Sequence, residues 1–145
     1  MTFFEGVWEL CDGAFASCAG VSAKPQITIT NEGPLTPDDI QRIKVVFPGN
    51  PARTGFGYTC THDADPTGEA DVDRYSIYFF EPQLDGSIRH YFGRVIDDIP
   101  NPPSGRREST MRGKFITMGP TAVSGSIAAT GAAIDDWTSN RPPTD

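Results

Sequence analysis

Glycine and proline interrupt this sequence at short intervals along its whole length. The chain contains 15 glycines and 13 prolines, which leave no room for long helices. The segments between them are rich in β-branched and aromatic residues, which favour strands. Eight or nine strands are therefore predicted, from the segments 5–11, 25–31, 43–48, 54–62, 72–81, 87–96, 111–118, 121–130 and 133–139.

So many short strands at regular spacing are typical of a sandwich or a closed barrel, and only closure removes the exposed sheet edges. Because consecutive strands can pair as hairpins, we predict an all-β fold, a single antiparallel up-and-down barrel of about eight or nine strands. The barrel is expected to occupy residues 1–141, with 142–145 as a flexible tail. One short helix is expected within Leu35–Ile43, where Thr36 can cap it and Pro37 suits its first position.

Composition limits the partners and the location of the chain. The formal net charge is −7, whereas nucleic-acid binding needs clustered Lys and Arg, so no nucleic-acid partner is expected. No run of 18 apolar residues and no basic, apolar export signal are present, so we expect no membrane partner and a cytoplasmic location. The odd number of cysteines (Cys11, Cys18 and Cys60) favours free, buried thiols.

Residues 72–96 are predicted to form a hairpin, and its register depends on the loop. A two-residue turn at Asp85-Gly86 would place Glu81 opposite His90. A three-residue loop, Leu84–Gly86 with Gly86 at a bulge, would shift the pairing by one residue and change the partners. In either register both faces carry aromatic residues, so the second face should be covered by a partner subunit, the helix or a Pro-rich loop. A homodimer is therefore a possible state.

The segment Gly6-Val7-Trp8 resembles the opening of the calycin superfamily, which comprises the lipocalins and the fatty-acid-binding proteins. In that superfamily the Trp of a Gly-x-Trp signature plugs the closed end of the barrel, and an Arg from the last strand stacks on it. The resemblance implies these roles for Trp8 and Arg141. It also implies a barrel that holds a small, largely apolar organic molecule.

Polar and aromatic side chains for such a site are concentrated in three predicted strands. His90 is the preferred acid–base residue because it titrates near neutrality, with Glu81 to orient it and Tyr78 nearby. These three residues are the catalytic candidates. The candidate ligand-binding residues are aromatic side chains and one arginine: Trp8, Tyr58, Tyr75, Phe79, Tyr91, Phe92 and Arg94.

No metal or cofactor is expected. His62 and His90 stand 28 positions apart, and no phosphate-binding glycine loop or dinucleotide fingerprint occurs. Residues 63–74 partly match a calcium loop, but Arg74 occupies the place of the bidentate Glu, so a solvated acidic loop is preferred. Two functions follow: binding of a small apolar molecule, or a cofactor-free cyclase or isomerase acting on a substrate in the same barrel. A third hypothesis is a protein-interaction module that uses the aromatic hairpin.

Overall fold

A computed structural model describes residues 3–61, 75–99, 108–120, 127–129 and 134–142. Nine strands lie in these described residues, close to the predicted segments. Of the predicted strand 121–130, the structure describes a strand of three residues. The strands are β1 (Gly6–Asp12), β2 (Gln26–Glu32), β3 (Ile40–Phe47), β4 (Arg53–Cys60), β5 (Ser76–Pro82), β6 (Ile88–Ile99), β7 (Glu108–Pro120), β8 (Ile127–Ala129) and β9 (Asp135–Asn140).

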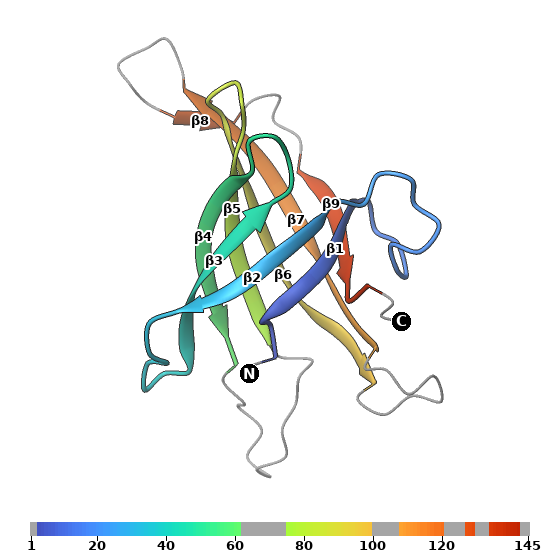
Figure 1. The fold of residues 1–145 in the computed structure, drawn as a ribbon, viewed down its shortest axis with the longest axis vertical. Helices are drawn as coiled ribbons and strands as arrows, with labels where there is room; N and C mark the ends of the chain where they lie inside the picture. The colour runs from blue at the N-terminus through green and yellow to red at the C-terminus, as the bar shows by residue number, and fades with distance from the viewer. Residues whose placement is uncertain (1–2, 62–74, 100–107, 121–126, 130–133, 143–145) are drawn as a thin grey trace.

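Eight of these strands form a closed antiparallel barrel (Figure 1). β1 to β6 pair in sequence order, β6 pairs with β7, β7 with β9, and β9 with β1. The short β8 lies outside the ring and, within the described part of the chain, pairs only with the end of β7. The predicted all-β, closed antiparallel architecture is confirmed. No helix in the described part of the chain is long and apolar enough to cross a membrane.

Alternating side chains fill the barrel interior with apolar groups. β2, β3 and β5 alternate buried and exposed positions as strands with one covered face do. Two inward positions of β4 are Gly55 and Gly57, where a Cβ atom would lie 1.7 Å from the Phe80 carbonyl oxygen and 1.9 Å from the Tyr78 carbonyl oxygen. Glycine is therefore required at these two positions, because a Cβ atom would overlap the backbone of β5. The largest fully buried side chains are Trp8, Trp137, Tyr91, Phe4, Phe47 and Phe79.

The predicted helix within Leu35–Ile43 is wrong. Residues 37–39 form a turn, and β3 already begins at Ile40. The Thr36 hydroxyl accepts a hydrogen bond from the Ile40 amide at 3.0 Å, and Asp39 has a φ of 59°. The capping residue therefore closes the β2–β3 hairpin, because the alternating burial of β3 outweighs the local helix signal.

The hairpin between β5 and β6 has the three-residue loop. Phe79 pairs with Tyr91, Glu81 pairs with Arg89, and Phe80 pairs with His90. The Gly86 amide donates to the Gln83 carbonyl, and Gly86 has a φ of 87°, as a bulge after a tight turn requires. The shifted register is confirmed, and the pairing of Glu81 with His90 is wrong.

Cys11 and Cys18 form a disulfide, so the prediction of free thiols is wrong for these two residues. Cys60 is free and partly buried, in the described part of the chain. The disulfide ties the segment between β1 and β2 against the outside of the barrel. There the Cys18 amide donates to the Asn140 side chain at 2.7 Å, and the Phe15 amide donates to the Thr138 hydroxyl at 2.9 Å.

Candidate functional site

One end of the barrel is closed by the N-terminal residues. Trp8 is fully buried, and the Arg141 guanidinium carbon lies 4.3 Å from the centre of its ring. Phe3 packs against Trp8 and Tyr75, and the Arg141 guanidinium donates to the Phe3 carbonyl. A cation over an indole face is stabilising. The arrangement expected for Trp8 and Arg141 is thus present at this end.

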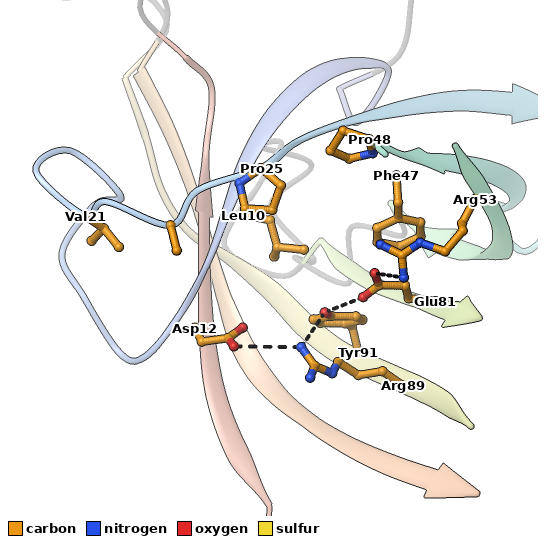
Figure 2. A pocket seen from close by; sticks show the side chains of 11 residues that line it. Leu10, Asp12, Val21, Pro25, Phe47, Pro48, Arg53, Glu81, Arg89 and Tyr91 are labelled. Atoms are coloured by element: carbon orange, nitrogen blue, oxygen red, sulfur yellow. Dashed lines mark hydrogen bonds and ion pairs between the residues drawn. The ribbon is translucent and has the colours of Figure 1, made fainter. Parts of the chain in front are cut away.

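The opposite end opens into a pocket with a volume of about 230 Å³ (Figure 2). Its wall comes from the strand ends of β1, β3 and β5 and from the segment that carries the disulfide. Most of the lining is apolar, and four charged side chains lie among it. The lining residues are Leu10, Asp12, Val21, Ala23, Pro25, Phe47, Pro48, Arg53, Glu81, Arg89 and Tyr91.

A stack of aromatic rings forms the floor of this pocket. The rings of Tyr91 and Phe79 are stacked with centroids 4.7 Å apart, and Phe47 lies 6.5 Å from Tyr91. Trp137 contacts the rings of Phe79 and Tyr91 edge-on from below, in the space that Gly93 leaves free. The floor is rigid because each ring is buried and contacts at least two others.

A chain of polar contacts runs across the floor. The Glu81 carboxylate pairs with Arg53 at 2.7 Å and accepts the Tyr91 hydroxyl at 3.0 Å. An Arg89 nitrogen lies 3.4 Å from the Tyr91 oxygen and 3.7 Å from the Asp12 carboxylate. Figure 2 shows these five side chains converging from β1, β4, β5 and β6. Two cations and two carboxylates therefore balance in formal charge.

Burial, followed by the Glu81 carboxylate, raises the pKa of the Tyr91 phenol well above its usual value. Tyr91 therefore stays protonated and acts as a hydrogen-bond donor near neutral pH. The Arg89 guanidinium carbon lies 4.6 Å from the centre of the Phe115 ring, and its buried Nε has no hydrogen-bond partner among the described residues. Arg89 is thus held in place with donor capacity to spare.

The structure separates the predicted site residues into two groups. Residues of the first group lie inside the barrel: Trp8 and Tyr75 at the closed end, and Phe79, Glu81 and Tyr91 at or below the pocket. Residues of the second group lie on the outer face: Tyr58, Tyr78, His90, Phe92 and Arg94.

The second group includes two of the three catalytic candidates. The Tyr78 hydroxyl and His90 Nδ1 are 2.8 Å apart and form a hydrogen bond on the outer face. Burial lowers the pKa of His90. The structure does not bring Glu81 to either residue, because Glu81 points into the barrel and pairs with Arg53.

Sequence reasoning missed Arg53 and Asp12, and it counted Arg89 among the available polar side chains without assigning it a role in the site. The shifted hairpin register would have identified Arg89, because it places Glu81 opposite Arg89 and Phe79 opposite Tyr91. No local signal identifies Arg53, which reaches Glu81 from a different strand.

No cluster of three or more His, Cys, Asp or Glu side chains that could hold a metal ion occurs among the residues that the structure describes. His62, the acidic loop 63–74 and the end of the tail, residues 143–145, lie outside the described residues. Comparison with models of known protein families, with curated proteins and with solved structures gave no match.

Proposed function

We propose that the protein binds a small, largely apolar organic molecule in the pocket at the open end of its barrel, as in a calycin-like carrier. The observation that carries this proposal is the apolar pocket above a buried aromatic floor, with polar groups converging at one side. Binding sites for small molecules combine these features. The volume of about 230 Å³ is below the usual range of roughly 300–1,000 Å³, so the ligand is smaller than a typical drug.

The polar groups suggest the chemistry of the ligand. Both polar contacts of the Arg89 guanidinium within the described chain use the same nitrogen, Nη1. Arg89 therefore retains donors for a ligand oxygen, and a guanidinium binds a carboxylate with particular strength. The preferred ligand is an apolar molecule that carries a carboxylate or a comparable acceptor group.

Octanoate and its neutral counterpart octanol are suitable probes, with amide chemical shifts in NMR as the readout. We expect octanoate to shift the signals of the pocket residues and to bind more tightly than octanol. Arg89→Met keeps the length of the side chain but removes the donors. It should weaken octanoate binding about 10- to 150-fold, because a hydrogen bond to a charged group contributes roughly 1.5–3 kcal/mol. Octanol binding should change little.

Leu84→Ala, in the exposed hairpin turn, is the matched control and should bind both probes as the wild type does. Native mass spectrometry of the purified protein provides a second test, because it would detect a small molecule that co-purifies in the pocket. The absence of shifts with both probes and of any co-purified molecule would contradict the proposal.

A second candidate function, cofactor-free isomerisation or cyclisation of the same ligand, is supported by the hydrogen bond from Tyr91 to Glu81. The phenol would transfer its single donor hydrogen bond from Glu81 to a substrate oxygen, while the aromatic floor holds the carbon skeleton. Tyr91→Phe should then reduce turnover by about 10²–10⁴ and leave binding nearly intact. A role for His90 and Tyr78 would require a substrate on the outer face.

The disulfide also bears on location. Disulfides of this kind are typical of oxidising compartments. We therefore propose an oxidising environment rather than the cytoplasmic location expected from the sequence, and a count of free thiols in protein isolated from its native cells tests this directly.

A further inference from the structure

Six rings cover the outer face of β4, β5 and β6. They are Phe56, Tyr58, Tyr78, Phe80, His90 and Phe92, which we call the aromatic face. Tyr58, Tyr78 and Phe92 stand side by side on three adjacent strands, and Tyr78 and Phe92 have centroids 5.0 Å apart. Phe56, Phe80 and His90 form a parallel row, with centroids 6.3 and 6.5 Å apart.

The aromatic face is open to solvent. Tyr58 and Phe92 are 54% and 52% exposed, and Phe56 is 39% exposed. Two shallow hollows follow the rings: one contacts Tyr58, Tyr78 and Phe92, and the other contacts Phe56, Tyr58 and Phe80. Exposed rings in this number on a single face indicate a binding surface.

Cations lie beside these rings. Arg42 pairs across the strands with Tyr58, Lys44 with Phe56, and Phe92 with Lys114. One carboxylate lies at each edge of this group: Glu32 of β2 is opposite Arg42, and Asp136 of β9 forms an ion pair with Lys114. Arg94 follows Phe92 on the same face of β6. Among the described side chains, no Asp or Glu lies on the outer face of β3 to β7, although the chain as a whole has a net charge of −7. The sequence separates these cations, and the fold gathers them around the rings.

The charge distribution selects the kind of partner. A two-fold dimer through this face would bring two copies of the same cationic surface together, so a symmetric second copy is disfavoured. An anionic partner with flat groups fits both features. Single-stranded nucleic acid has this chemistry, because its bases stack on aromatic side chains while cations follow its phosphates.

We propose that the aromatic face binds a short stretch of single-stranded nucleic acid. Tyr58, Tyr78 and Phe92 stack two or three bases, and Arg42, Lys44 and Arg94 contact the backbone phosphates. This site lies on the opposite side of the sheet from the pocket at the barrel end. A failed test of one proposal therefore does not affect the other.

Fluorescence anisotropy with labelled ten-nucleotide thymidine and uridine oligonucleotides, at 50 mM salt, tests this proposal. Tyr58→Ala and Phe92→Ala should each weaken binding about 5- to 150-fold, the usual effect of losing one stacked base. Both residues are largely exposed, so these variants should fold. Phe15→Ala removes a comparably exposed ring (43% exposed) outside the aromatic face and should bind as the wild type does.

The charge component is measured by salt titration. Arg42→Gln combined with Lys44→Gln should reduce the slope of log affinity against log salt by about 1.4, since each phosphate contact on a single strand contributes about 0.7. The proposal would be overturned if Tyr58→Ala and Phe92→Ala bound the oligonucleotides as tightly as the wild type does. It would also be overturned if the wild type bound them with a Kd above about 100 µM at 50 mM salt. Equal affinity for polyglutamate would assign the face to acidic proteins. A dimer that Phe92→Ala dissociates would assign it to a second copy.

Discussion

Removal of the disulfide should destabilise the barrel by an amount that the structure predicts. The bond between Cys11 and Cys18 closes a loop with a sequence separation of seven. The loop-entropy relation gives about 2.4 kcal/mol of stabilisation for a loop of this length. The double variant Cys11→Ala/Cys18→Ala should lose this amount, which corresponds to a decrease in Tm of about 5–10 °C. Alanine is preferred because both sulfurs are buried, and burying a hydroxyl costs free energy unless it is hydrogen-bonded.

Urea unfolding with and without reductant measures this effect. The wild type should lose about 2.4 kcal/mol on reduction, and the double variant should not respond to reductant. Cys60→Ala is the control, because Cys60 is free and its replacement leaves the effect of reductant intact. Identical unfolding midpoints of the wild type with and without reductant would refute the reasoning, as would three titratable thiols in unreduced, unfolded protein.

Three further substitutions test other parts of the fold. Arg141→Leu should lower the free energy of unfolding by about 1–2 kcal/mol, because it removes the cation over Trp8; an unchanged urea midpoint would show that the stacking contributes nothing. Gly57→Ala should cost about 3 kcal/mol or more, because its Cβ would meet the Tyr78 carbonyl oxygen; a native circular dichroism spectrum and Tm would contradict this. The pKa of Tyr91 in the folded protein lies above its value of about 10 in the unfolded chain. The free energy of unfolding is therefore not reduced by ionisation of this phenol below about pH 10, and it decreases as the pH rises above about 10. The decrease is at most about 1.4 kcal/mol per pH unit, and Tyr91→Phe should show a smaller one. Equal slopes would contradict the predicted burial of the phenol.

The sequence predicts the strands well, because alternation and turn residues are local signals. It fails where two local signals compete. Thr36 and Pro37 resemble a helix start, but the burial pattern of the following residues places them in a hairpin. It also fails where the outcome depends on distant residues. The pairing of Cys11 with Cys18 depends on how the intervening segment packs on β9, and the odd cysteine count does not reveal it.

The candidate site was predictable only in part. Glu81 and Tyr91 were identified as polar and aromatic candidates, but a shift of one residue in the hairpin decides which side chains enter the barrel. That shift places Arg89 at the pocket and His90 on the outer face. Arg53 and Leu10 reach the pocket from other strands, so only the closed barrel brings them together.

A crystal structure of the protein with octanoate tests the central claim most directly. We expect electron density for the chain along Leu10 and Phe47, above the Tyr91 ring, with the carboxylate within hydrogen-bond distance of Arg89. Side chains that fill this space in the crystal, or octanoate bound only elsewhere on the protein, would contradict a ligand-binding pocket at the open end of the barrel.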